Sequence, residues 1–288
     1  MSSAAAVPPP SGAGGASAAM IGGLLDQIQP EASDEEEDEE PDAEFLFEAS
    51  GGGEDAAAAG EPVQPGDCRA VVVCCPGAAT AFALGALPLQ PVPWRLAPAP
   101  GRPPRAFPPP PRPPRFFAAR DGGGAAIAVA LLDGPVPADV ASAWAEALLA
   151  GFGGSTEVLL LDRVFRAGWR APGSGERPLE PHLCGLWTSA WGAEGPAGLG
   201  GPAARLPAPN AVEGLGAALL AQCEATQRRC LVALALQDGA HLGETCVRAF
   251  LGLLPLMQEL GLPPLDGPPD FRGALSRVIP PASMSIYA

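Results

Sequence analysis

Four short runs in the second part of the chain are apolar over most of their length. They cover residues 70–75, 126–132, 157–164 and 230–236. Strands that are apolar on both faces are typical of a parallel sheet that is covered on both sides. The runs therefore predict four buried strands of a mostly parallel central sheet.

Helical segments separate these runs. Four of them are rich in Ala or Leu, at residues 78–87, 137–152, 210–226 and 244–260. In the second, Val140, Trp144 and Leu148 fall on one face, and Pro255 should kink or end the last. Because strands and helices alternate along the chain, the predicted fold class is α/β, with helices on both faces of the sheet.

Two stretches break this alternation. Residues 88–115 are packed with proline and arginine, and they predict an extended, polyproline-like surface insertion rather than a packed element. Such an insertion is either a PxxP ligand for an SH3-type domain or an expanded loop. Residues 171–204 predict a loop with a short helix around 183–191, and another short helix is expected at 271–278.

The charge of the chain is concentrated at its start. The formal net charge is −15, and residues 1–66 hold 15 acidic residues and no basic one. This composition predicts a disordered acidic tail over 1–66, followed by a neutral α/β domain over 67–279. Within the tail, the apolar patch at 45–47 is either a partner-binding element or an incidental hydrophobic spot. Nothing indicates a basic surface for nucleic acid.

Cysteine usage and hydropathy predict the compartment. The seven cysteines are odd in number, form no CxxC pair and mostly lie in apolar runs, as reduced core cysteines do. We therefore expect a reducing compartment, the cytoplasm or the nucleus. The sequence shows no secretory signal and no apolar stretch long enough to span a membrane, so no membrane partner is expected.

Patterns for catalysis and metal binding are missing. The chain has no lysine for a P-loop and no GxSxG nucleophile turn. The glycine-rich residues 151–156 follow a helix and precede a strand, the reverse of a phosphate-binding loop. Neither His182 nor His241 has a nucleophile beside it in sequence. We therefore predict no catalytic residue, no metal site and no cofactor.

Two alternatives to a plain binding protein remain open. An enzyme on a nucleoside-phosphorylase-like scaffold would place its pocket where strands end, near Cys75, Asp133, Asp162 and Asp238. An interaction scaffold would instead work through the acidic tail and the Pro/Arg-rich insertion at 88–115.

The last three residues, Ile286, Tyr287 and Ala288, are the candidate partner-binding site, at the end of a flexible segment over 280–288. Tyr287 is the only tyrosine of the chain. A hydrophobe, a tyrosine and a terminal carboxylate can fill apolar pockets, make one directed hydrogen bond and pair with a lysine or with backbone N–H groups. The alternative is a frayed terminus without a role.

Several segments resemble the proteasome assembly chaperones. In chain order they are the acidic run 34–40, the strand–turn–helix 71–87, the Pro-Asn segment 206–212 before a helix bearing Cys223, the strand 231–236, the helix bearing Ala249-Phe250, and the terminus 285–288. The Pro-Asn segment, which holds the only asparagine, Asn210, and the terminus are the most specific of these. The insertion at 88–115 and the proline-rich residues 262–269 have no counterpart in the family's pattern.

The resemblance implies a chaperone without catalytic activity. Such a chaperone pairs with a second, related chaperone as a heterodimer and promotes assembly of the α-subunit ring of the 20S proteasome. The resemblance further implies that Ile286, Tyr287 and Ala288 insert between neighbouring α subunits. The expected partners are therefore the second chaperone and the proteasome α subunits.

Overall fold

The computed structural model describes most of the chain between residues 45 and 279. The described residues are 45–49, 63–98, 112–120, 124, 126–170, 183–196, 199, 205–237, 242–265 and 267–279. They belong to one compact unit, Ala43–Ala288. The acidic run at 34–40 and the terminal segment 280–288 lie outside the described residues.

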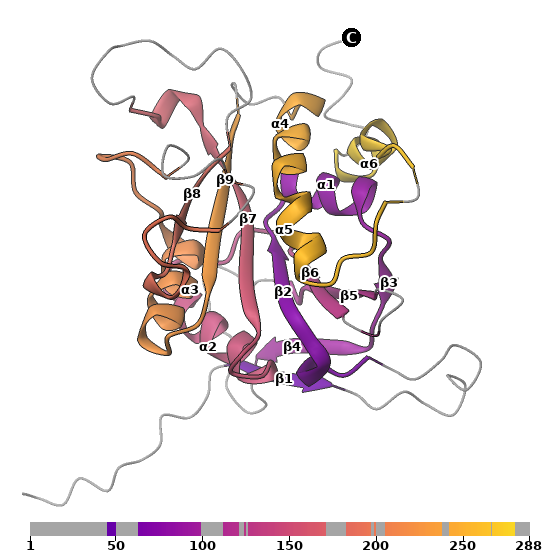
Figure 1. The fold of residues 1–288 in the computed structure, drawn as a ribbon, viewed down its shortest axis with the longest axis vertical. Helices are drawn as coiled ribbons and strands as arrows, with labels where there is room; N and C mark the ends of the chain where they lie inside the picture. Colours follow the sequence, from indigo (N-terminus) through magenta and orange to yellow (C-terminus); the bar gives the residue numbers. More distant parts are fainter. Residues whose placement is uncertain are drawn as a thin grey trace, which may run out of the picture. The chain divides into compact units, whose positions relative to one another are not determined.

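A seven-stranded sheet in the order β3-β5-β6-β2-β7-β9-β8 forms the centre of the fold (Figure 1). Its four inner strands run parallel: β6 (Ala126–Leu131), β2 (Cys68–Cys74), β7 (Glu157–Phe165) and β9 (Cys230–Gln237). All residues of β6 and β9 are buried, which continuous apolar runs make favourable. The four strands predicted from the sequence are confirmed.

Antiparallel strands form both edges of this sheet. β5 (Arg115–Arg120) pairs with β6, and β3 (Gln90–Pro91) lies outside it. On the other edge, β8 (Leu183–Trp187) pairs with β9. The expected helix around 183–191 is therefore wrong for its first half, and only the 3-10 turn η4 (Ser189–Trp191) is helical. The ladder to β9 explains this, because it uses the backbone groups of 183–187 that a helix would need.

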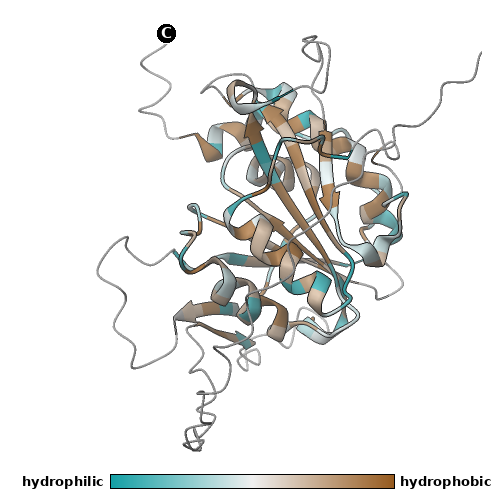
Figure 2. Ribbon diagram, turned by 90° about the vertical axis from the view of Figure 1, so that its left-hand side faces the viewer, coloured by the Kyte–Doolittle hydropathy of each residue, from teal (hydrophilic) through white to brown (hydrophobic). Residues whose placement is uncertain are grey.

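Helices cover both faces of the sheet. One face carries α1 (Ala78–Ala86), α4 (Glu244–Ala249), α5 (Leu254–Glu259) and α6 (Phe271–Val278), and the other carries α2 (Ala141–Gly151) and α3 (Gly214–Ala225). Val72 of β2 packs on the first face, and Val71 and Val73 pack on the second. Figure 2 shows the apolar strands between these helical layers. The predicted α/β class is confirmed.

Shorter turns complete the described structure. The 3-10 turns are η2 (Pro65–Asp67), η3 (Arg166–Gly168) and η6 (Phe250–Leu253), besides η4. η6 separates α4 from α5, and Pro255 lies in the first turn of α5, where its missing N–H costs no helical bond. The predicted interruption of the last long helix is confirmed. None of the described helices is long and apolar enough to cross a membrane.

A second, two-stranded sheet adds to the core on the side of α2. β1 (Phe45–Ala49) pairs antiparallel with β4 (Trp94–Pro98). The Phe47 ring lies 6.3 Å from that of Trp94, 5.4 Å from that of Phe116 and 5.3 Å from that of Phe152, measured between ring centroids. This aromatic cluster explains the pairing, since each ring buries a large apolar area.

Two expectations from the sequence are wrong at this sheet. Residues 45–47 were expected to be either a partner-binding element or an incidental hydrophobic spot in a solvated tail. They instead form a strand that pairs with β4 of the same chain, and Phe45 is only 7% exposed. Part of the Pro/Arg-rich insertion is packed, since Trp94 and Leu96 are buried. Burial of the Trp94 and Leu96 side chains stabilises this packed segment even though proline residues surround it. Residues 99–111 of the insertion lie outside the described residues.

The aromatic cluster yields a stability prediction. Replacing Phe47→Ala should lower the free energy of unfolding by about 3 kcal/mol, because the cluster loses its central ring. The neighbouring substitution Leu46→Ala is the matched control, since Leu46 is 39% exposed and should cost less than about 0.5 kcal/mol. Urea unfolding of both variants measures the difference. Equal, small losses in the two variants would show that β1 does not belong to the folded body.

Candidate functional site

The structure fixes the residues that precede the predicted docking tail. Ile286, Tyr287 and Ala288 lie outside the described residues, so their contacts remain a prediction. The last described element is α6, which begins after Asp270. The Asp270 carboxylate accepts a hydrogen bond from the Gly273 N–H at 2.9 Å, which caps the helix.

α6 is held against α1 at both of its ends. The Asp270 N–H donates to the carbonyl of Gly85 at 3.0 Å, and the Arg277 guanidinium donates to the carbonyl of Leu84 at 3.3 Å. Phe271 is buried between the two helices and stacks near Phe82. A Cβ at position 85 would lie 2.8 Å from the Asp270 carbonyl, so this close contact needs a glycine. Residues after Ile279 therefore start from a fixed point on the body.

The second candidate region lies where the parallel strands end. Of the four residues predicted there, the structure brings Cys75 and Asp162 together, and their side chains share a hydrogen bond. Asp133 instead forms an ion pair of 3.0 Å with Arg115. Asp238 lies outside the described residues. The structure thus joins two of the four predicted residues.

Burial raises the pKa of both members of the Cys75–Asp162 pair. It raises the pKa of the Cys75 thiol well above its ordinary value, and the Asp162 carboxylate acts in the same direction. Burial also raises the pKa of Asp162, against hydrogen bonds from the Arg163 N–H and the Cys75 thiol. Because only a thiolate is an effective nucleophile, this geometry is unsuited to nucleophilic catalysis.

Three residues beside this pair, Arg163, Phe165 and Gln237, were not predicted from the sequence. The Arg163 guanidinium donates to Gln237 Oε1 at 2.9 Å and lies 5.1 Å from the centroid of the Phe165 ring. It also lies over the turn that leads into α1, where Gly77 has φ +103° and a Cβ would approach the guanidinium to 3.2 Å. The signal was present in the sequence, because Asp162-Arg163 is a charged pair inside an otherwise apolar strand.

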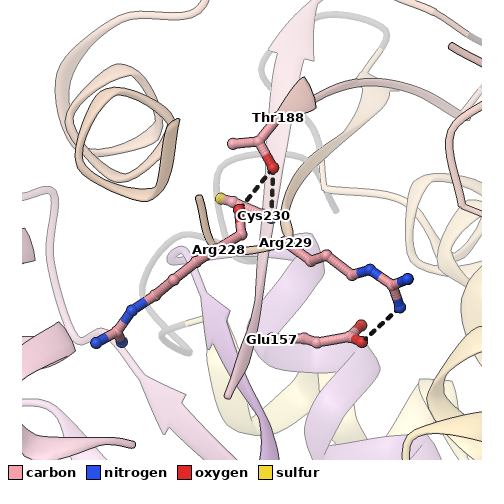
Figure 3. Close-up of polar contacts among 5 residues, drawn as sticks. All are labelled: Glu157, Thr188, Arg228, Arg229 and Cys230. Atoms are coloured by element: carbon pink, nitrogen blue, oxygen red, sulfur yellow. Dashed lines mark hydrogen bonds and ion pairs between the residues drawn. The ribbon is translucent and has the colours of Figure 1, made fainter. Parts of the chain in front are cut away.

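Hydrogen bonds and an ion pair connect the residues at the start of β7 and of β9, at the other end of the sheet from Cys75 and Asp162 (Figure 3). The Thr188 hydroxyl donates to the carbonyl of Arg228 at 2.8 Å and accepts from the Cys230 N–H at 3.0 Å. The Arg229 guanidinium pairs with Glu157 at 3.1 Å. Burial raises the pKa of Glu157, whereas Arg229 opposes that rise. These bonds tie the edge strand β8 and the start of β9 to β7.

A cavity of about 440 Å³ opens beside this network. It is lined by Trp187, Thr188, Ser189, Gly192, Ala193, Arg205 and Glu224. The Glu224 carboxylate accepts from the Ser189 N–H and hydroxyl, and the Trp187 indole N–H donates to the Gly192 carbonyl at 3.2 Å. The Glu224 carboxylate and the Trp187 indole of this cavity therefore already have hydrogen-bond partners within the protein. Among the described residues, no group of three or more His, Cys, Asp or Glu side chains could hold a metal ion.

Asn210, from the segment that resembles the family, has a structural role. Its side chain accepts from the Arg170 N–H at 2.9 Å and donates to the carbonyls of Arg170 and Pro207, both at 2.8 Å. It thereby joins the end of the β7–η3 segment to the loop before α3. Only a side-chain amide offers a donor and an acceptor in this geometry, which explains an asparagine in a chain that has no other.

Comparisons with known proteins bear on the fold alone. No protein-family model and no curated protein sequence matches the chain. The structure is similar to PbaB of Pyrococcus furiosus, an archaeal proteasome activator, with a TM-score of 0.50 and 12% identity over 85% of this chain and 97% of PbaB. PbaA of the same organism, an archaeal homologue of proteasome-assembly chaperone, has a TM-score of 0.49 and 15% identity over 77% and 91% of the two chains.

A third similar structure is a proteasome-assembly chaperone homologue from Mycobacterium tuberculosis. Its TM-score is 0.42 and its identity 13%, over 76% of this chain and 92% of that chain. At these identities, the likeness to PbaB shows a shared fold.

The buried carboxyl group of Asp162 predicts a pH dependence of stability. Because its folded-state pKa is raised, the folded protein binds this proton more tightly than the unfolded chain does. Relative to Asp162→Asn, the wild type should therefore lose stability as the pH rises from the ordinary value of 3.8 through the raised pKa. Urea unfolding of both proteins at pH 4 and pH 7 measures this. A stability difference that is constant over this range would contradict it.

Proposed function

We propose that this protein is a chaperone for assembly of the 20S proteasome. In this proposal it is the first subunit of a heterodimer with a related chaperone, and it promotes assembly of the α-subunit ring. Its residues Ile286, Tyr287 and Ala288 insert between neighbouring α subunits. The observation that carries the proposal is the hydrophobe-Tyr-X sequence that follows α6, an element fixed on a body with the fold of PbaB, itself an archaeal proteasome activator.

The tail has enough reach and apolar area for such docking. Residues 280–288 can extend to at most about 30 Å beyond Ile279. Burial of Ile286 and Tyr287 contributes about 2–4 kcal/mol, and pairing the terminal carboxylate with a lysine contributes about 1.5–3 kcal/mol. Ordering the tail opposes these contributions. The tail alone should therefore bind weakly, and contacts of the folded body should supply the remaining affinity.

The chemistry at the strand ends supports a binding function over an enzyme. Burial keeps the Cys75 thiol protonated, and the Arg163 guanidinium is directed to a side-chain amide. We accordingly propose that the protein acts without catalysis and without a cofactor.

Truncation of the tail tests the proposal. Tyr287→Ala, or deletion of Tyr287 and Ala288, should weaken binding to purified 20S proteasome about tenfold or more, because the buried ring and the carboxylate contact are lost. Ser285→Ala is the matched control and should bind like the wild type. Biolayer interferometry measures affinity, and circular dichroism verifies the fold. If all four proteins bind the proteasome equally, the tail is not the docking element.

A further inference from the structure

Phe165 is an exposed aromatic residue at the end of a central strand. It is the last residue of β7 and 45% exposed, and only Leu46 is a comparably exposed large hydrophobic residue among those described. Along β7, Val158 to Leu161 are buried, Asp162 to Val164 are half-buried, and Phe165 is exposed. Aromatic and arginine side chains are both enriched at protein–protein interfaces relative to the rest of the surface.

Arg163 makes this exposed ring part of a pre-organised pair. Its guanidinium stacks over Phe165 at 5.1 Å and is held from behind by the amide of Gln237, which is 1% exposed. Among the described residues, no carboxylate lies within ion-pair distance of this guanidinium. Within the described part of the chain, the Phe165–Arg163 pair therefore combines an exposed aromatic ring with a cation that no carboxylate contacts directly. Aromatic and arginine side chains held in this way dominate the affinity of protein interfaces.

The pair lies at the carboxyl end of β7, and the described residues end at Ile279, directly after α6. Figure 1 shows α6, the last described element, toward the same end at which β7 and β9 finish. A tail of nine residues cannot place its last residues more than about 30 Å from Ile279. A protein that receives the tail therefore has to approach this end of the body. An interface of ordinary size covers about 800 Å² on each partner, a patch roughly 30 Å across.

We propose that the proteasome surface that receives the terminal tail also docks on the Phe165–Arg163 pair. This inference rests on the proposed function and identifies the body contact that the weak tail requires. The receiving surface has an apolar pocket for the Phe165 ring and, next to it, an acidic side chain that pairs with Arg163. The tail and the pair then form a two-point attachment, in which each contact raises the effective concentration of the other.

Single substitutions in the full chain test this attachment. Phe165→Ala and Arg163→Gln should each weaken binding to purified 20S proteasome about tenfold, although the tail is intact. Leu46→Ala removes the other exposed large hydrophobic residue, in β1, and should change the affinity by less than about twofold. Thermal unfolding of each variant identifies any loss of fold, and Phe165→Leu provides a second variant that keeps an apolar side chain.

The outcomes separate the inference from the proposed function. If Phe165→Ala and Arg163→Gln bind like the wild type while Tyr287→Ala is weakened, the tail docks without this pair and the inference is overturned. If these two variants keep proteasome binding but lose the partner chaperone, the pair belongs to the heterodimer interface, which also overturns it. If the wild type itself does not bind the proteasome, the proposed function fails and the inference with it.

Discussion

The fold depends on covering four parallel strands that are apolar on both faces. Val71 and Val73 of β2 point to one side and Val72 to the other, and all three are fully buried. Neither face of such a strand can be left to water, because each exposed aliphatic side chain would forgo about 1.5–3 kcal/mol. The need for two cover layers explains the helices on both faces, and it explains why an element as remote in sequence as β1 is recruited to complete the second layer.

This double cover also determines where function can lie. Side chains inside the sheet are fully used in packing, so recognition is left to the strand ends, to the edges and to segments that leave the body. At the strand ends, burial raises the pKa of Cys75 and of Asp162, whereas the Phe165 ring is exposed beside the Arg163 guanidinium. At the margin of the first layer, the tight contact of Gly85 with α6 gives the chain that follows a fixed point of departure. Rigid attachment points of this kind suit a protein that holds a partner.

The sequence predicted the central sheet because its signal is local. Continuous apolar runs such as 126–132 specify a buried strand without reference to any partner. The sequence failed where pairing partners decide the structure. Phe47 contacts Trp94, Phe116 and Phe152, which are distant from it in sequence, only in the folded chain. The packing of Trp94 was not predicted because its neighbours in sequence are rich in proline. Cys184 and Trp187 form β8 because β9 offers an edge. For the candidate sites, Asp162 and Cys75 could be predicted because they lie at strand ends. The contact of Gln237 with Arg163 could not, because it depends on the pairing of β7 with β9.

The most direct test of the central claim is to locate the terminal tyrosine in a complex with the proteasome. Tyr287→p-benzoyl-phenylalanine places a photoreactive ring at this position in the full chain, and mass spectrometry of irradiated mixtures with purified 20S proteasome identifies the bonded peptides. A docking tail predicts cross-links to peptides at the boundary between two α subunits, and their loss when an excess of the unmodified protein is added. Cross-links that fall only within the protein's own chain would contradict the account.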